Sequence, residues 1–352
     1  MRVLVTGGGG FVGSNVVAVA TERGDDVAVL VRQLPVRPEP GCRYSVLDLL
    51  DTAAVSGAVE DARPDVVVHT AIWNDFAGIY AERRLAWEAY VGVTRTLADA
   101  ANAVGAALLT VSTDWVFDGT QGPADERTPP NPVNYYGVLK AASELVTFER
   151  AQDPIVVRIA GVQGVHRAGQ PQRGQGAGFG HLAGAVVAAL SAGEEFTVWE
   201  SAAINSLATP SLASVAAEWM LALAERGSRG TFHCCGADGV TRMELAARAA
   251  AAFDLDPALL RSGPPDPGVV RFGRLPFDTR LDARVTAREL VRDVPSLDEL
   301  LARLRAECSR GYAPSGQPDL KVSRSHGPCA EARCPDRSGL LRAAPGRPAR
   351  RR

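Results

Sequence analysis

The chain opens Arg2-Val-Leu-Val-Thr6-Gly-Gly-Gly-Gly10-Phe-Val-Gly13, and this stretch decides the fold. A short apolar run leads into a glycine turn, and a helical pattern then extends to Arg23. Glycines let the backbone turn tightly and approach a pyrophosphate, whose charge is stabilised at a helix N-terminus. A glycine run alone is weak evidence, but a strand before it and a helix after it favour a dinucleotide site over an ordinary loop. The stretch therefore predicts an α/β fold with a Rossmann-type, doubly wound parallel sheet.

The end of the second expected strand selects between two nicotinamide cofactors. This strand covers Asp26–Val31, and Arg32 follows it, with no acidic residue between Leu30 and Val36. A carboxylate at this position binds the ribose hydroxyls of NAD, whereas an arginine nearby suits the 2′-phosphate of NADP. Arg32 therefore favours NADPH, with NADH as the alternative. The ordinary role of such a residue is that of a solvated arginine at a strand end.

Two further expected strands contribute candidate cofactor contacts. Residues 44–49 form the third strand, and Asp48 is either an acceptor for the adenine amino group or a turn-capping residue. Residues 65–71 form the fourth strand, after which residues 70–73 pass beside the cofactor phosphates. We interpret His69 as a packed or hydrogen-bonded strand residue, because no second metal-type ligand lies at a useful spacing. No metal site is predicted.

A hydroxyl, a phenol and an ammonium form the candidate catalytic set. Residues 106–112 predict a fifth strand, which delivers Thr113 to the carboxyl edge of the sheet, where open parallel sheets bind ligands. A helix that begins near Asn134 carries Tyr136 and Lys140, and their spacing places both on one face. A fixed ammonium lowers the pKa of a neighbouring phenol because it favours the phenolate. Such a phenol can pass a proton near neutral pH, which the oxygen of a carbonyl under reduction requires.

The second half of the chain predicts a smaller lobe. Residues 155–160 form a sixth strand, and the glycine-rich loop 161–181 carries Arg167 and Arg173. These arginines either bind a diphosphate through charge-assisted hydrogen bonds or belong to a solvated loop, and a loop that orders over substrate satisfies both readings. Asn205 and Thr209 are interpreted as capping residues, with sugar or base contacts as the alternative. Helices are expected at residues 182–192, 212–226, 243–253 and 297–308.

Composition and charge exclude several classes of protein. The chain is 46% hydrophobic and 22% charged, as globular proteins are. Before Ser309, Asp and Glu outnumber Lys and Arg by 37 to 28, whereas from Ser309 onward Lys and Arg predominate by 10 to 3. The acidic body argues against a nucleic-acid surface. No apolar run approaches the ~20 residues of a membrane helix.

The expected organisation follows from these patterns. Residues 1–160 form an NAD(P)-binding Rossmann domain with contributions from later segments, and residues 161–308 form a substrate-binding lobe. Residues 309–352, rich in Pro, Gly, Ser and Arg, predict a disordered basic tail. The six cysteines are scattered as reduced cytosolic thiols are, and no signal-peptide pattern opens the chain. We therefore expect a cytoplasmic protein.

Two motifs carry a resemblance to a known family. Ser112-Thr-Asp-Trp-Val-Phe-Asp-Gly119 is similar to S-T-D-Y-V-F-D-G, and Asn131-Pro-Val-Asn-Tyr-Tyr-Gly-Val-Leu-Lys140 contains a sequence similar to N-x-Y-G-x-x-K. Together with the spacing Gly7-x-x-Gly10-x-x-Gly13, they resemble the extended short-chain dehydrogenase/reductases and, within them, the dTDP-4-dehydrorhamnose reductase family. More weakly, the resemblance continues through residues 230–236 and 278–282.

The resemblance implies a role for each candidate residue. Tyr136 donates the proton, Lys140 lowers its pKa and binds the nicotinamide ribose, and Thr113 hydrogen-bonds the substrate carbonyl oxygen. Asp114 lies at the substrate. The resemblance places Gly10, Phe11 and Val12 over the pyrophosphate and Asp48 and Leu49 near the adenine. Together with the residues inferred from the glycine turn and the strand ends, the candidate cofactor contacts are Gly7, Gly10, Phe11, Val12, Gly13, Arg32, Asp48, Leu49, Ala71, Tyr136 and Lys140. The family dimerises through the helices after the fourth and fifth strands, which implies a homodimer.

The implied activity is NADPH-dependent reduction of a 4-keto-6-deoxy nucleotide sugar. The related sugar-nucleotide dehydratases carry T-D-E, and Trp115 replaces that second acid here, which argues against dehydration. Many extended reductases have N-V-x-G-T where this chain has Tyr90-Val-Gly-Val-Thr94, without the asparagine. One alternative is an NAD-dependent nucleotide-sugar epimerase with the same Tyr/Lys pair. The other is a non-catalytic nucleotide-binding regulatory subunit, as in the β subunit of methionine adenosyltransferase.

Overall fold

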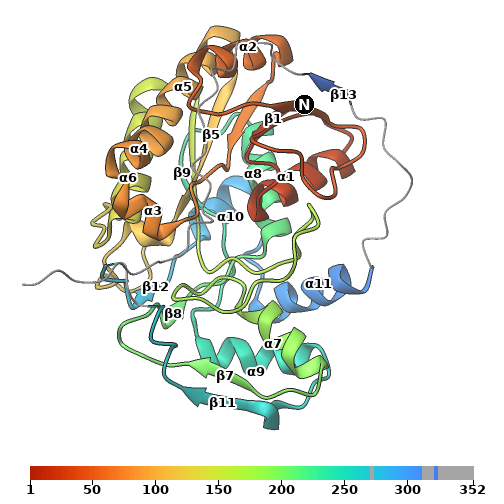
Figure 1. Cartoon of the computed structure of the whole chain (residues 1–352), viewed down its shortest axis with the longest axis vertical. Helices are drawn as coiled ribbons and strands as arrows, with labels where there is room; N and C mark the ends of the chain where they lie inside the picture. The colour runs from red at the N-terminus through yellow and green to blue at the C-terminus, as the bar shows by residue number, and fades with distance from the viewer. Residues whose placement is uncertain (270–272, 311–320, 324–352) are drawn as a thin grey trace, which may run out of the picture.

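A parallel sheet forms the centre of the molecule (Figure 1). The computed structural model describes residues 1–269 and 273–310, and the backbone of 321–323. The strand order β3-β2-β1-β4-β5-β6-β9 confirms the Rossmann-type α/β fold that the sequence predicts. The backbone of β13 (Lys321–Ser323) runs parallel beside β3. The other strands are β1 (Arg2–Thr6), β2 (Asp26–Val31), β3 (Arg43–Val46), β4 (Val66–His69), β5 (Ala107–Thr113), β6 (Pro154–Ile159) and β9 (Gly230–His233).

Helices cover both faces of this sheet. The central strands are buried along almost their whole length, so they consist of near-continuous Val, Leu and Ile runs rather than an alternating pattern. Two apolar cores result, one on each side of the sheet. One face carries α1 (Phe11–Glu22), α8 (Ala213–Glu225) and α10 (Arg284–Leu290); the other carries α2 (Thr52–Ala62), α5 (Val93–Val104) and α6 (Tyr135–Arg150).

The segment between β4 and β5 is less regular than its composition suggests. The Ala- and Leu-rich run predicts one helix over residues 81–103, but the backbone leaves the helical region at Glu82, with φ −114° and ψ 57°. After this break the chain forms a short α-helix and a π-helical turn, and α5 follows directly. Composition indicates helix here, but it does not indicate this change of direction; α3 and η1 on either side of it both contact α6. The elements are α3 (Phe76–Ala81), α4 (Arg83–Trp87) and η1 (Glu88–Gly92).

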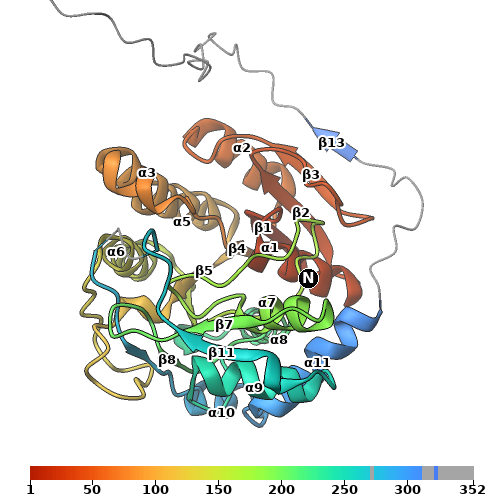
Figure 2. The ribbon, with the colours of Figure 1, turned by 60° about the horizontal axis from the view of Figure 1, so that its bottom comes forward.

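A smaller lobe lies below the sheet in Figures 1 and 2. Its core is formed by α7 (Leu182–Ser191), α9 (Arg242–Ala252) and α11 (Leu297–Ser309). The lobe contains a parallel pair, β7 (Phe196–Trp199) and β11 (Leu260–Gly263), and short strands β8 (Leu207–Ala208), β10 (Val240–Thr241) and β12 (Asp278–Thr279). The 3₁₀ turns are η2 (Asp114–Val116) and η3 (Pro257–Leu259). The second half of the chain also supplies β9 and α8 to the larger body.

Several expectations concern features that the described residues show only in part. Most of the tail that begins at residue 309 lies outside the described residues. In the described ranges, no helix has the length and apolar content to cross a bilayer. Within the same ranges, no group of three or more His, Cys, Asp or Glu side chains is arranged to hold a metal ion. The described cysteines are unpaired thiols.

Candidate active site

A cavity of about 1130 Å³ lies along the carboxyl edge of the sheet. Its walls come from the glycine turn after β1, the ends of β2, β4 and β5, the first turns of α6 and the loop 161–181. Parallel strands end at the same edge, so segments far apart in sequence meet there. The candidate catalytic residues, the candidate cofactor contacts and Asp114 all line this cavity: Gly7, Gly10, Phe11, Val12, Gly13, Arg32, Asp48, Leu49, Ala71, Thr113, Asp114, Tyr136 and Lys140.

The glycine turn is compact because two of its residues have no room for a side chain. Gly7 adopts φ +72°, and a Cβ built on it would lie 2.7 Å from Ala71 Cα. A Cβ on Gly13 would lie 2.5 Å from the Thr70 hydroxyl oxygen and would also strike the Gly7 carbonyl. The Gly10 N–H donates to the Gly7 carbonyl at 2.8 Å, and α1 begins immediately afterwards. The turn therefore presents bare backbone and a helix N-terminus to the cavity, as a pyrophosphate requires.

The far end of the cavity carries the two residues proposed to contact the adenosine half of the cofactor. Arg32 is exposed there and directly follows β2. Asp48 is also exposed, and its carboxylate accepts a hydrogen bond from the Leu50 N–H at 3.0 Å. The turn-capping role that the sequence allows for Asp48 is therefore present. It leaves the carboxylate on the cavity wall, so adenine contact remains compatible with it.

The carboxyl end of β5 places a hydroxyl beside a buried carboxylate. Thr113 Oγ1 donates to Asp114 Oδ1 at 2.9 Å and accepts from the Trp115 N–H at 3.3 Å. Asp114 is 4% exposed, and its second oxygen has no hydrogen-bond partner in the described part of the chain. Burial raises the pKa of Asp114 to about 6, although the hydroxyls of Thr279 and Thr113 act in the opposite direction. The position of Thr113 at the sheet edge agrees with the sequence prediction.

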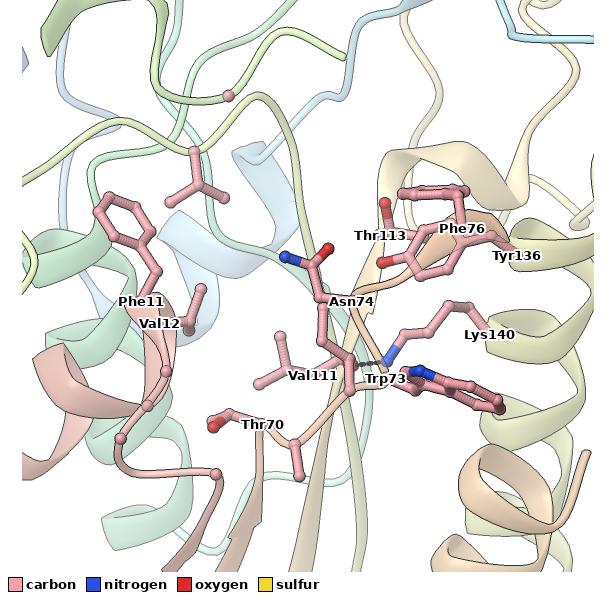
Figure 3. A pocket seen from close by; sticks show the side chains of 18 of the residues that line it. Phe11, Val12, Thr70, Trp73, Asn74, Phe76, Val111, Thr113, Tyr136 and Lys140 are labelled. Atoms are coloured by element: carbon pink, nitrogen blue, oxygen red, sulfur yellow. Dashed lines mark hydrogen bonds between the residues drawn. The ribbon is translucent and has the colours of Figure 1, made fainter. Parts of the chain in front are cut away.

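Tyr136 and Lys140 project from one face of α6 toward the end of β5 (Figure 3). The sequence predicts that Lys140 lowers the pKa of Tyr136, and this expectation is wrong for the structure. Burial and the neighbouring Asp114 charge raise the pKa of the Tyr136 phenol, while Thr113 partly offsets them. Lys140 instead donates from Nζ to the Val111 carbonyl (dashed in Figure 3). Burial lowers the pKa of Lys140 to about 8, against the opposite effect of Glu144.

Behind this pair lies a buried ion pair that the sequence does not reveal. Arg158 on β6 donates to Glu144 on α6 at 2.9 and 2.7 Å, and each side chain is 3% exposed. Ser112 donates to the same carboxylate. Glu144 lies one turn beyond Lys140, and Ser112 directly precedes Thr113. The network therefore fixes α6 against β5 and β6 immediately behind the candidate catalytic residues.

Aromatic rings surround the Tyr136 phenol. The ring of Trp115 lies edge-on to it at 5.9 Å between centroids, and Phe76 lies 5.5 Å away. Tyr90 approaches from η1 at 6.1 Å, and its hydroxyl donates to the Trp73 carbonyl. Figure 3 shows Phe76 beside Tyr136 and the Asn74 amide directed into the cavity. The sequence assigns no site role to Phe76, Asn74 or Tyr90, because these residues come from the irregular segment after β4.

The loop 161–181 packs over the N-terminus of α1. The ring of Phe11 contacts His181 at 4.3 Å and His166 at 5.9 Å between centroids. Burial and the nearby cations lower the pKa of His181 to about 4, so it is neutral at physiological pH. The two loop arginines separate: Arg173 lines the cavity, whereas Arg167 donates to Glu22 of α1 at 2.6 Å. Of the two arginines predicted to bind a diphosphate, only Arg173 lines the cavity in this structure.

Asn205 and Thr209 are neither helix caps nor cavity residues. Both are fully buried, and Asn205 Nδ2 donates to the carbonyls of Phe277 and Leu207 and to Thr279 Oγ1. Thr209 exchanges hydrogen bonds with the backbone of Leu281. Both alternatives from the sequence are wrong, since these side chains hold β8 against β12. His69 matches its predicted packed role: it is buried, and Nδ1 lies 2.8 Å from Thr6 Oγ1.

The fold and the cavity define a Rossmann-type α/β protein with the glycine turn of a dinucleotide site. The chain belongs to the family described as the RmlD substrate binding domain, whose model matches residues 1–307. This family is nucleotide-sugar-binding and NAD(P)-dependent. The resemblance to the dTDP-4-dehydrorhamnose reductases is thereby confirmed.

The similar proteins of this family include reductases and proteins named as a subunit of another enzyme. The dTDP-4-dehydrorhamnose reductase of Streptomyces griseus is 38% identical over 165 residues, which is 46% of this chain and 50% of the relative. Methionine adenosyltransferase 2 subunit beta of Rattus norvegicus is 34% identical over 45% of this chain and 46% of the relative. The match thus spans about half the length of these relatives. A probable low-salt glycan biosynthesis reductase of Haloferax volcanii is 27% identical over 88% of this chain and 99% of the relative.

Solved structures show the same fold at low sequence identity. A dTDP-4-dehydrorhamnose reductase from Bacillus anthracis, in complex with NADP, superposes with a TM-score of 0.71 and 22% identity over 87% of this chain and 98% of that chain. The UDP-glucose 4-epimerase of Thermus thermophilus, complexed with NAD, gives 0.70 and 24% over 89% of this chain and 100% of that chain. These likenesses show the fold and leave the reaction open.

Proposed function

We propose that this protein is a short-chain dehydrogenase/reductase that reduces a 4-keto-6-deoxy nucleotide sugar with NADPH. The observation that carries the proposal is the convergence of Thr113, Tyr136 and Lys140 on the cavity that the glycine turn enters. Family membership supports a nucleotide sugar as the ligand class. The reductases of Streptomyces griseus and Haloferax volcanii support the direction of the reaction.

The residues present fit the cofactor. Gly7 and Gly13 allow a tight turn that presents bare backbone and the N-terminus of α1 to the cavity, and Arg32 offers an exposed cation at the end of β2 for a 2′-phosphate. Bound NADPH supplies the hydride for the keto carbon. Thr113 orients the substrate carbonyl through a hydrogen bond, and Lys140 is placed to bind the nicotinamide ribose. These are the groups that would hold the cofactor and substrate in a reactive pair.

The raised pKa of Tyr136 suits a proton donor. A donor must carry its proton when the reaction begins, and burial beside Asp114 keeps the phenol protonated at neutral pH. As negative charge develops on the carbonyl oxygen, the phenol gives its proton to that atom. Trp115 and Phe76 exclude water on the outer side of the phenol, which strengthens the electrostatic interactions within the cavity.

The test of the catalytic assignment is Tyr136→Phe. We expect turnover to fall by about 10²- to 10⁴-fold because the general acid is lost, while NADPH affinity changes little. The assay is NADPH oxidation with a panel of nucleotide 4-keto sugars. Tyr135→Phe is the matched control, since the Tyr135 hydroxyl donates to the Arg83 carbonyl rather than facing Tyr136. Full activity in Tyr136→Phe would refute the assignment.

Arg32→Ala tests the cofactor assignment. Loss of a charge-assisted contact should raise the Kd of NADPH by about 10- to 100-fold and leave that of NADH unchanged. The control is Arg43→Ala, which removes an exposed ion pair with Asp26 on the neighbouring strand. Equal losses for both cofactors would refute a 2′-phosphate contact.

A regulatory subunit is the second candidate, and the relatives named methionine adenosyltransferase 2 subunit beta favour it. It predicts retained NADP binding with no NADPH oxidation for any keto-sugar nucleotide. The epimerase reading instead predicts release of one equivalent of NAD when the purified protein is denatured. Measurements of NADP binding, NADPH oxidation and NAD release on one purified protein therefore distinguish a reductase, a regulatory subunit and an epimerase.

For the quaternary state we propose a homodimer through α5 and α6. Leu145 and Phe148, three residues apart on α6, are 70% and 41% exposed. An apolar group of this kind on one helical surface is typical of a protein–protein contact. Sedimentation analysis of the full chain, with Leu145→Glu as the disrupting variant, tests it.

A further inference from the structure

A fully buried arginine in the smaller lobe has no carboxylate partner among the described residues. Arg242, the first residue of α9, is 1% exposed and forms no ion pair there. Burial of an unpaired charge is costly, and an apolar residue of similar size usually costs less. Burial lowers the pKa of Arg242 to about 10, so the guanidinium still carries its charge at neutral pH. Its compensation must therefore come from neutral groups.

Those neutral groups belong mainly to one stretch of the cavity loop. Arg242 donates to the carbonyls of Gly176 and Gly178, each at 3.0 Å, and to the side-chain carbonyl of Gln175 at 3.2 Å. A fourth bond reaches the Asn205 carbonyl at 3.1 Å. The guanidinium also lies over the ring of Phe179, 5.7 Å from its centroid. One side chain thus contacts most of the positions between residues 175 and 179.

These contacts orient the loop relative to the cavity. Gly176, Ala177 and Gly178 line the cavity, whereas Arg242 does not. The carbonyl of Ala177 is also directed into the smaller lobe, where it accepts from the Asn205 N–H at 3.0 Å. All three carbonyl groups are therefore directed at groups of the smaller lobe. We call residues 176–178 the loop wall of the cavity.

The loop wall in turn contacts the surroundings of Tyr136. A Cβ on Gly178 would lie 3.0 Å from Cζ2 of Trp115, so the glycine backbone packs directly against the indole ring. The same indole lies edge-on to the Tyr136 phenol. A displacement of the loop wall therefore changes the width of the cavity at the phenol. The glycines allow this close approach, but they supply no side chain that would hold the backbone in place.

We propose that Arg242 is a positioning residue that holds the loop wall against Trp115 and so defines the substrate end of the cavity. The proposal rests on the proposed function for the identity of the substrate. Arg242 acts through the loop and does not itself contact substrate. Because a positioned wall binds ground state and transition state alike, its loss should raise KM and leave kcat nearly unchanged.

The test compares Arg242→Met and Arg242→Lys with the wild-type chain in two assays. In steady-state NADPH oxidation, Arg242→Met should raise the KM for the keto-sugar nucleotide by about tenfold, with kcat and the Kd of NADPH within about threefold. In limited trypsin digestion without substrate, cleavage after Arg173 should accelerate by a similar factor. Arg242→Lys keeps the charge but lacks the planar fork, so we expect an intermediate effect in both.

Arg248→Met is the matched control, because Arg248 lies on the same helix and pairs with Asp298 at the surface. It should match wild type in both assays. Unchanged digestion after Arg173 in Arg242→Met and Arg242→Lys would overturn the proposal, as would equal losses in kcat and NADPH affinity. The digestion requires no turnover, so an inactive wild-type protein would refute the proposed function while the digestion still decides the role of Arg242. If Arg242→Met does not fold, Arg242→Lys carries both measurements.

Discussion

Two buried arginines lie on different sides of the cavity and are compensated in different ways. Arg158, behind Thr113 and Lys140, forms an ion pair with Glu144 that joins α6 to the sheet. Arg242, behind the loop wall, binds only neutral acceptors and an aromatic ring in the described part of the chain. The first arrangement links regular elements that are already packed. The second orients the carbonyl groups of Gly176 and Gly178, two positions that have no side chain to pack.

The largest expected effect separates these two kinds of compensation. Arg158→Met should lower the free energy of unfolding by about 3–5 kcal/mol, because it leaves Glu144 buried without its partner. Arg242→Met should cost less, since no buried charge remains behind. Urea unfolding monitored by circular dichroism measures both.

A double variant completes this comparison. Glu144→Gln combined with Arg158→Met should recover part of the loss, because the uncompensated carboxylate is then removed. Arg303→Met removes a half-exposed pair with Glu218 and should cost about 1 kcal/mol or less. A loss for Arg158→Met no larger than that of Arg303→Met would contradict the assigned role of the buried pair.

The next effect concerns the buried carboxylate on the Thr113 side. Unfolded chains release the Asp114 proton near the ordinary pKa of 3.8, whereas the folded protein retains it to about 6. The folded state therefore binds more protons in that window, and its stability should fall as pH rises through it. Asp114→Asn lacks this proton and should gain about 2–3 kcal/mol relative to wild type across the window.

Denaturant unfolding at a series of pH values measures this difference between Asp114→Asn and wild type. The comparison cancels the other titrating groups, provided that the amide keeps the hydrogen bond from Thr113. A constant difference from about pH 4 to about pH 6 would show that Asp114 ionises normally in the folded protein.

The smallest expected effect is a difference in KM between variants of the two arginines in the loop 161–181. Arg173 lines the cavity, and Arg173→Ala should raise the KM for NADPH or for the nucleotide sugar by about tenfold through a lost charge-assisted contact. Arg167→Ala should leave both values within about twofold, because Arg167 pairs with Glu22 outside the cavity. A larger effect of Arg167→Ala would mean that the loop adopts another arrangement when ligands bind.

The contrast between the two sides also explains what the sequence could predict. Gly7, Gly13, Thr113, Tyr136 and Lys140 lie in short motifs, each on one strand, turn or helix, so local spacing is enough to place them. The alternation of strands and helices in the first half predicts a parallel sheet, whereas the order of its strands comes from the structure.

The spacing of residues within one motif does not predict contacts between residues that are far apart in the sequence. Arg242 meets Gln175 across 67 residues, and nothing in either stretch indicates the other. The direction of the Tyr136 pKa was wrong for a related reason: helical spacing shows that Lys140 is near, but not that its ammonium binds Val111 while Asp114 faces the phenol. Asn205 and Thr209 were assigned as caps because their contacts with residues 277–281 lie on the other strand of a pair.

The aromatic surroundings of Tyr136 have a practical consequence for spectroscopy. Of the five tryptophans, Trp73 and Trp115 line the cavity, whereas Trp199 and Trp219 are buried elsewhere and Trp87 lies on the outer surface. Indole emission depends on the polarity of its surroundings, and reduced nicotinamide absorbs that emission. The protein therefore contains its own fluorescent reporter: a bound cofactor should quench both cavity indoles, and a ligand that enters beside the loop wall should change the emission of Trp115.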